Sequence, residues 1–182
     1  MLDKFLRKWR FSRAASHVPL RARLLDIGSE DGTFIRSLQN RIDHAVGMDP
    51  AYAKAMSKSG YKLIPGRFPR DIGGLQGTFQ AITMIAVIEH LPAEELEICV
   101  RSCAELLDLD GLVIITMPSP RVDKILYYLK KAGLVQARTL DEHYGLEPDL
   151  ALQAFLNGPF DLLVSQKFQF GLNNLFVFKR RL

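Results

Sequence analysis

Cysteine and long apolar runs are both scarce in this sequence. Its two cysteines, Cys99 and Cys103, do not make a disulfide framework, and no further cysteine or nearby histidine completes a metal-ligand set. No apolar run is long enough to span a membrane. The N-terminus is basic and amphipathic, and it lacks the apolar core and cleavage site of a secretory signal. We therefore expect a cytoplasmic protein without a metal site.

Phosphate-binding glycine patterns are missing as well. The chain has no Gly-Lys-Ser or Gly-Lys-Thr phosphate loop, and its glycines do not fit the dinucleotide fingerprint. Repeats and low-complexity segments are also absent from the sequence. What remains is an ordinary composition of 182 residues, 48% hydrophobic and 24% charged, which suits one globular domain with a sizeable core.

Positive charge is concentrated at one end of the chain. Residues 1–23 contain seven lysines and arginines against Asp3 alone, whereas the whole chain has a net charge of +4. Because the excess lies at one end, it argues against nucleic acid as a general partner. Residues 2–15 also carry an apolar stripe at helical spacing, made of Leu2, Phe5, Leu6 and Trp9.

We expect residues 1–20 to form an N-terminal amphipathic helix that acts as a lid on the sheet or over a binding site. A second interpretation is peripheral contact of residues 1–17 with an anionic membrane or a lipid-linked substrate. Both interpretations follow from the same apolar stripe and basic flanks, and the sequence leaves both open.

The stretch from Leu24 to Phe34 is the most informative part of the chain. Its first residues are apolar and predict the end of a buried parallel strand. Gly28 and Gly32 permit a sharp turn and close approach of the backbone to a ligand. Residues 33–38 then carry apolar side chains at helical spacing. Such a strand-turn-helix lies at the carboxyl edge of a sheet, where open α/β folds bind ligands.

The charges of this turn discriminate between ligands. Asp26, Glu30 and Asp31 would repel the pyrophosphate of a dinucleotide. An acidic turn favours a cationic ligand instead. S-adenosylmethionine (SAM) meets this requirement, because it has a sulfonium and an ammonium group, and its single carboxylate can accept hydrogen bonds from backbone N–H groups.

The turn resembles the first motif of class I SAM-dependent methyltransferases, Asp-x-Gly-x-Gly-x-Gly. Asp26, Gly28 and Gly32 match it, and Glu30 stands where the middle glycine usually lies. The resemblance implies that these four residues bind SAM. We expect the Glu30 side chain to point out of the turn, so that the ligand still fits.

Two later segments extend the resemblance to the rest of a cofactor site. Asp49 directly follows an expected strand at residues 44–48. In dinucleotide folds an acid at such a strand end accepts hydrogen bonds from a ribose diol. The resemblance implies the same role, although Asp49 before Pro50 also suits a plain turn. Phe68 lies in the region that borders adenine in the family, and it is either a stacking residue or a loop anchor.

The fold implied by the resemblance is α/β: a single Rossmann-like domain with a mainly parallel seven-stranded sheet, an antiparallel last strand and helices on both faces. Residues 21–182 make up this methyltransferase domain. The expected strands are 22–27, 44–48, 61–64, 79–85, 111–117, 160–168 and 172–178. The expected helices of this domain are 32–40, 51–59, one from Pro92, 121–132 and 148–156.

The function implied by the resemblance is SAM-dependent methyl transfer to a small molecule. Glu89 and His90 resemble the region near the acceptor in quinone and sugar O-methyltransferases, which favours an oxygen acceptor. A nucleic-acid base is a weaker alternative, because residues 85–88 do not resemble the Asn/Asp-Pro-Pro-aromatic motif of those enzymes. A non-catalytic SAM-fold binding or regulatory protein is the alternative from another class. The acceptor itself and the oligomeric state stay open.

A hydroxyl acceptor must lose a proton, and histidine suits this task near neutral pH. Among the four histidines, His90 follows an expected strand at the ligand edge, and His143 lies in a polar loop after residues 121–132. We predict that one of these two is the base, with His90 ahead. The plain alternatives are a helix-start residue for His90 and a surface residue for His143.

Overall fold

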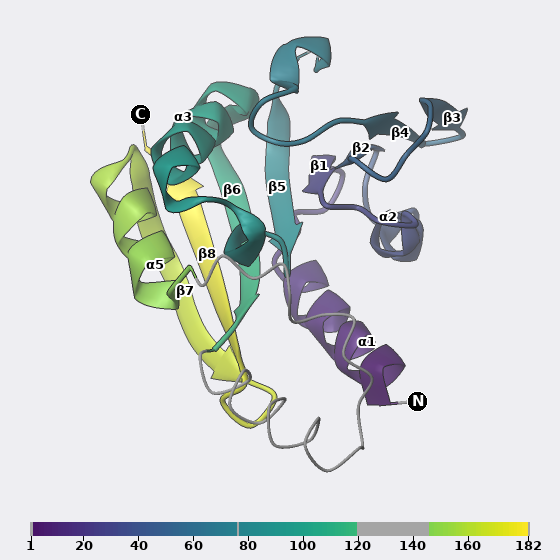
Figure 1. Cartoon of the computed structure of the whole chain (residues 1–182). Helices are drawn as coiled ribbons and strands as arrows, with labels where there is room; N and C mark the ends of the chain where they lie inside the picture. Colours follow the sequence, from purple (N-terminus) through teal and green to yellow (C-terminus); the bar gives the residue numbers. More distant parts are fainter. Residues whose placement is uncertain (1, 76, 120–145, 182) are drawn as a thin grey trace.

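Five neighbouring strands of the sheet run parallel, so their carboxyl ends lie at the same edge of the sheet (Figure 1). The computed structural model describes residues 2–75, 77–119 and 146–181. The described strands form an eight-stranded sheet in the order β3-β4-β2-β1-β5-β6-β8-β7. Their bounds are β1 Arg23–Ile27, β2 His44–Asp49, β3 Met56–Lys58, β4 Tyr61–Pro65, β5 Phe79–Ile85, β6 Leu107–Pro118, β7 Phe160–Phe168 and β8 Asn173–Arg180.

The sheet confirms the expected Rossmann-like architecture and corrects the number of strands from seven to eight. The last strand, β8, pairs antiparallel with β6, as expected. The additional strand is β3, which replaces the helix predicted over residues 51–59. That segment has no apolar face to bury, because residues 53–59 are all exposed. Gly60, with φ of +80°, instead allows a two-residue turn that pairs β3 antiparallel with β4.

Helices cover both faces of the sheet. They are α1 Leu2–Ala15, α2 Thr33–Leu38, α3 Leu96–Leu106 and α5 Pro148–Asn157, with short 3₁₀ turns at η1 Ile72–Gly74, η2 Ile88–His90 and η3 Ala93–Glu95. The helix expected from Pro92 therefore begins with a 3₁₀ turn before α3. The helix predicted over residues 121–132 lies outside the described residues.

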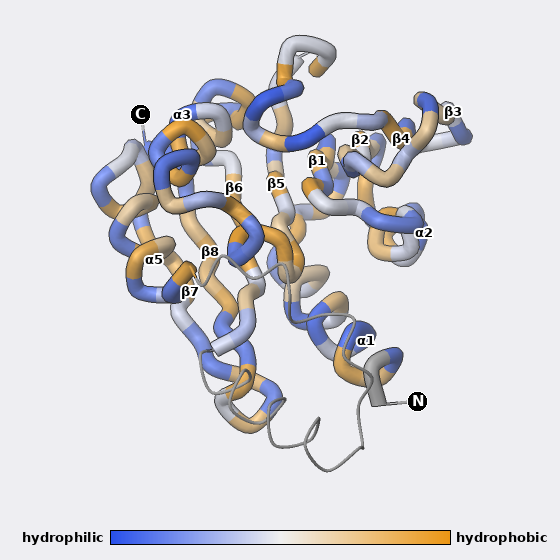
Figure 2. The backbone as a smooth tube through the Cα atoms, in the orientation of Figure 1, coloured by the Kyte–Doolittle hydropathy of each residue, from blue (hydrophilic) through white to orange (hydrophobic). Residues whose placement is uncertain are grey.

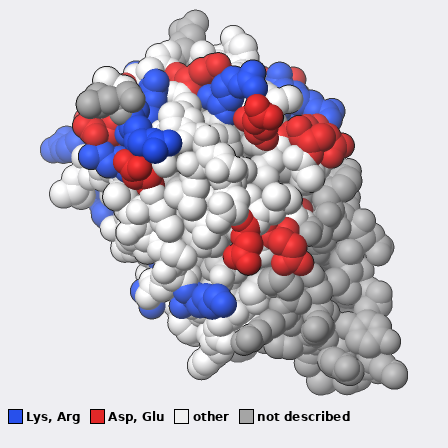
Figure 3. All heavy atoms as spheres, turned by 90° about the vertical axis from the view of Figure 1, so that its left-hand side faces the viewer, with Lys and Arg blue, Asp and Glu red and all other residues white. Residues whose placement is uncertain are grey.

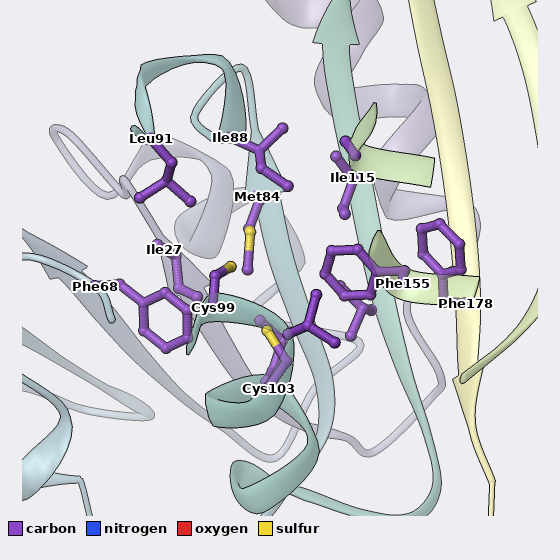
Figure 4. Packing of buried hydrophobic residues seen from close by; sticks show 14 of the residues in the cluster. Ile27, Phe68, Met84, Ile88, Leu91, Cys99, Cys103, Ile115, Phe155 and Phe178 are labelled. Carbon is purple, nitrogen blue, oxygen red and sulfur yellow. The ribbon is translucent and has the colours of Figure 1, made fainter. Parts of the chain in front are cut away.

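Alternation along the strands divides the core into two layers. Leu24 and Ile114 pack with α1 and α2 on one face, whereas Leu25 and Ile115 pack with α3 and α5 on the other. Figure 4 shows the second layer, where Cys99 and Cys103 of α3 lie among Met84 and Phe155. Both cysteines are completely buried and unpaired, which confirms that they are core residues.

Helix α1 belongs to the core at one end and to the ligand edge at the other. Ala14 near its end is fully buried, and Arg41 Nη1 donates a hydrogen bond to the Ala15 carbonyl at 3.0 Å. The first half of α1 extends past the carboxyl ends of the strands (Figure 1). Hydrophilic and hydrophobic residues alternate along it (Figure 2). None of the helices in the described ranges is long and apolar enough to cross a membrane.

Candidate active site

The turn after β1 depends on glycine where it approaches the turn after β5. Gly28 has φ of +70°, and a Cβ atom there would lie 2.3 Å from Val87 Cγ2. The N–H of Gly28 donates to the Met48 carbonyl at 2.8 Å, which joins the turn to β2. Gly32, with φ of +71°, precedes the first residue of α2. The carboxyl ends of β1, β2 and β5 are thereby brought together around one turn.

Glu30 takes a backbone conformation that glycine adopts readily. Its φ is +49°, in the left-handed region that side chains rarely adopt. The Glu30 side chain is 71% exposed, and its Oε2 lies 3.3 Å from Arg7 Nη1 of α1. Asp31 Oδ1 lies 2.7 Å from Nη2 of the same arginine. A carboxylate in this turn is therefore accommodated by pointing toward solvent and α1.

Asp49 lies at the end of β2, and each of its carboxylate oxygens accepts one backbone hydrogen bond. Oδ2 accepts a hydrogen bond from the Glu30 N–H at 2.8 Å, and Oδ1 accepts one from the Ala51 N–H at 2.8 Å. A carboxylate oxygen has two lone-pair sites, so each oxygen keeps one for a ligand hydroxyl. The two backbone donors also hold the Asp49 side chain in a fixed orientation at the ligand edge.

Asp26 is the buried acid of the turn. Its Oδ1 accepts a hydrogen bond from the Thr83 hydroxyl at 2.6 Å, and the residue is 3% exposed. Burial raises the pKa of Asp26 to about 7, with Asp49 adding to the rise and the Thr83 hydrogen bond opposing it. The Asp26 carboxyl therefore changes charge within the neutral range, next to the turn at Gly28.

A cavity of about 880 Å³ lies at this edge of the sheet. Its volume falls in the range of small-molecule and cofactor sites. Its walls come from α1, the turn after β1, the end of β2, the loop after β4 and the segment after β5. The lining residues that the site uses are Arg7, Arg10, Asp26, Gly28, Glu30, Asp49, Phe68, Val87 and His90.

His90 is one of the predicted bases, and it lines the cavity from η2. Its neighbour Glu89 is 4% exposed, and the Glu89 Oε2 atom has no hydrogen-bond partner within the described part of the chain. Burial raises the pKa of Glu89 to about 7, and the charges of His90 and Arg10 act in the opposite direction. His143 lies outside the described residues.

Phe68 has features of both interpretations that the sequence left open. It lines the cavity, and it also belongs to the core cluster with an exposure of 5%. Its ring lies beside Ile27 and Cys99 (Figure 4). Phe68 is thus a well-anchored aromatic residue that also borders the cavity.

Several residues in or next to the cavity were not identified from the sequence. Arg7 and Arg10 line the cavity from α1, although the helix was interpreted by its apolar stripe. The signal that identifies them is their spacing of three residues, which places both on one helix face. Tyr52 Oη lies 3.0 Å from Ser29 Oγ and braces the turn, and no motif points to it. In the described ranges no group of three or more His, Cys, Asp or Glu residues has the arrangement of a metal site.

Comparisons with known proteins agree with this geometry. The profile of a family described as Methyltransferase domain matches residues 2–161. No curated protein sequence matches the chain. The PH0226 protein of Pyrococcus horikoshii OT3 has a similar structure, with a TM-score of 0.75 and 16% identity over 100% of this chain and 92% of its own.

Two similar structures contain the demethylated product S-adenosylhomocysteine (SAH). One is magnesium protoporphyrin IX methyltransferase from Synechocystis PCC 6803, with a TM-score of 0.65 and 16% identity over 95% of this chain and 82% of its own. The other is the N-methyltransferase NodS of Bradyrhizobium japonicum WM9, with a TM-score of 0.65 and 13% identity over 96% of this chain and 85% of its own.

This chain belongs to the methyltransferase domain family. It is an enzyme with a class I fold, and its methyl donor is SAM. The residues present fit this donor on three observations. Asp49 keeps a free lone-pair site on each oxygen, Gly28 keeps side-chain atoms out of the turn, and the cavity is large enough.

Proposed function

We propose that this enzyme methylates an oxygen atom of a small-molecule acceptor: a sugar, a quinone or a lipid-linked metabolite. The observation that carries the proposal is that His90 lines the same cavity as Asp49 and the turn at Gly28. A proton-accepting side chain and the residues proposed to bind the cofactor therefore line one cavity. Nucleic acid is not proposed as the acceptor, because the basic excess lies in residues 1–23 alone.

The residues proposed to hold SAM are Asp26, Gly28, Glu30, Gly32, Asp49 and Phe68. In this proposal Asp49 accepts the two ribose hydroxyls on its free lone pairs, and Gly28 lets the backbone approach the ligand. When bound, SAM supplies a methyl group already activated by its sulfonium. Phe68 borders the adenine in this proposal.

His90 is proposed to accept the proton of the acceptor hydroxyl, with His143 as the second candidate. Little covalent work falls to the protein, so its contribution is to orient the acceptor and to remove this proton. Glu89, directly before His90 in η2, is buried. The first half of α1 covers the cavity as a lid, with Arg7 and Arg10 on its inner face. A cytoplasmic location is part of the same proposal.

The test is methyl transfer to a panel of free sugars, hydroquinones and lipid-linked hydroxyls at saturating SAM, with SAH release as the readout. We expect turnover with at least one hydroxyl acceptor. His90→Gln should lower turnover by about 10²–10⁴-fold and leave SAM affinity unchanged. His44→Gln is the matched control, because His44 opens β2 at the opposite edge of the sheet. Wild-type turnover in both His90→Gln and His143→Gln across neutral pH would remove histidine as the base.

A further inference from the structure

The outer face of α1 carries one aromatic side chain that the fold leaves exposed, Phe5, next to the partly buried Trp9. Phe5 is 59% exposed, and Ala14 is fully buried. Nine residues separate the two, which is about two and a half helical turns and places them on opposite faces. The apolar stripe expected to pack on the sheet therefore points outward at Phe5. The inward face holds Arg7, Arg10 and Ala14 instead.

A second segment of the chain extends this aromatic surface. Phe170 in the turn between β7 and β8 is 93% exposed, and its ring lies 6.0 Å from the Trp9 ring in an edge-to-face arrangement. Trp9 also lies 5.9 Å from Phe5. Phe5, Trp9 and Phe170 thus form one aromatic ridge from two ends of the sequence. Helix α1 and this turn lie at the same, lower end of the molecule (Figure 1).

The turn holds Phe170 outward at a conformational cost. Gln169 and Phe170 have φ of +51° and +58°, in the left-handed region that side chains disfavour. Buried Gln169 overrides this preference, because its amide donates to the Leu6 carbonyl at 2.7 Å and its Oε1 accepts from Asn173. The Phe170 ring contacts Trp9, but its exposure of 93% leaves most of a large apolar side chain in solvent, which indicates a binding role.

Basic side chains flank the ridge. Lys4 and Lys8 lie beside Phe5 on α1, and both are exposed. Arg13 lies one turn after Trp9, and exposed Lys167 lies near the end of β7, before the aromatic turn. Asp3 is the only acid in the α1 sequence. On the α3–α5 side, in contrast, Figure 3 shows basic and acidic residues interspersed.

We propose that this aromatic ridge and its flanking lysines dock the enzyme on an anionic lipid bilayer. Aromatic rings insert at the interface between water and acyl chains, and lysines at their edge bind anionic headgroups. The inner face of the same half of α1 lines the cavity, so the docked bilayer lies next to the site. This surface goes beyond the proposed function and stands whether the acceptor is lipid-linked or free.

The test is flotation of the full chain with vesicles of phosphatidylcholine containing about 30% phosphatidylglycerol, compared with phosphatidylcholine alone. We expect binding to the anionic vesicles that weakens at high salt, because the Debye length shortens. Phe170→Ser and the pair Lys4→Gln/Lys8→Gln should each lower the partition coefficient by about tenfold or more. Ile98→Ser, at a 50% exposed position on α3, and Lys58→Gln/Lys62→Gln are the matched controls and should bind as wild type.

SAM binding by calorimetry accompanies each variant, so that a folded protein is assured and failure of the surface is separated from failure of the methyltransferase site. The proposal is overturned if wild type does not float with anionic vesicles, or if Phe170→Ser floats as wild type does. It is also overturned if Phe170→Ser abolishes a concentration-dependent dimer in sedimentation while vesicle binding is absent. That result would assign the ridge to a second copy of the chain.

Discussion

Two turns hold the first half of α1 over the cavity, and they do so by different interactions. The turn after β1 uses charges, since Arg7 lies 2.7 Å from Asp31 and 3.3 Å from Glu30. The turn between β7 and β8 uses the buried amide of Gln169, which donates to the Leu6 carbonyl. Exposed ion pairs contribute about 0–1 kcal/mol. A buried group that loses its partner costs about 1–3 kcal/mol. The position of α1 therefore depends more on the amide than on the charges.

The same two turns also show where a residue other than glycine can take a left-handed backbone conformation. Glu30 and Phe170 do so by pointing outward, with exposures of 71% for the Glu30 side chain and 93% for Phe170. A side chain at position 28 could not point outward in this way, because Val87 occupies the space where a Cβ atom of residue 28 would lie. The turn after β1 thus accepts a side chain at the family's middle glycine and excludes one at the first.

The largest effect is expected from Gly28→Ala. The new Cβ would meet Val87 Cγ2 at 2.3 Å and stand at an unfavourable φ, so the free energy of unfolding should fall by about 2–4 kcal/mol. Val87→Ala in the same chain should restore part of this loss, because it removes the clash and leaves the φ strain. Chemical denaturation measures both variants. A Gly28→Ala protein as stable as wild type would show that the turn is not tightly packed.

The pH dependence of stability tests the buried acid of the turn. Folding raises the Asp26 pKa from 3.8 to about 7, so its stabilising contribution is complete below pH 4 and is lost as pH rises to about 7. Asp26→Asn should therefore become steadily more stable relative to wild type as pH rises from about 4 to about 7. Burial also raises the pKa of Glu89 to about 7, so the stability of the Asp26→Asn variant should still fall somewhat as pH rises through this range. Parallel curves for wild type and Asp26→Asn would contradict the raised pKa.

The comparison of the two turns is tested most sharply at Gln169. Gln169→Ala leaves the Leu6 carbonyl and the Asn173 amide without their partner, so unfolding should become easier by about 1–3 kcal/mol. Hydrogen exchange in the first half of α1 should rise as well. Gln166→Ala, at an exposed position of β7, is the control and should match wild type. Equal exchange in both variants would assign the position of α1 to other contacts.

The smallest effect is expected from Arg7→Gln, which removes both ion pairs to the turn after β1. Stability should fall by about 0–1 kcal/mol at low salt and by less at high salt. Arg101→Gln removes an exposed pair within α3 and serves as the control. If Arg7→Gln lowers the free energy of unfolding more than Gln169→Ala does, the turn after β1 contributes more to the position of α1 than the turn between β7 and β8.

Most of the fold was predictable because buried parallel strands carry their own signal. Residues 79–85 form such a strand at the predicted bounds, and residues 160–168, an antiparallel edge strand with alternating burial, also have their predicted bounds. The helix predicted over residues 51–59 was wrong, because propensity without a face to bury does not stabilise a helix. The turn with Gly28 and the acid at Asp49 were recognisable as a motif, and the structure places both at one cavity.

The remaining features of the site depend on tertiary contacts. Arg7 and Arg10 reach the cavity because α1 docks with the face that carries them turned inward, which the apolar stripe of the sequence does not reveal. The burial of Glu89 beside His90 likewise follows from how η2 packs on β6, and not from local pattern. Local periodicity predicts elements, whereas the side that an element turns inward is decided by its neighbours.

Binding of SAM at Asp49 is the most direct test of the site as a whole. Calorimetry with wild type, Asp49→Ala and the control Asp43→Ala measures the affinity without any acceptor. Asp49→Ala should weaken SAM binding by about 1–3 kcal/mol, which is about 5–150-fold in Kd, and Asp43→Ala should bind as wild type. A folded Asp49→Ala protein that binds SAM with wild-type affinity would contradict the assignment of this cavity to the cofactor.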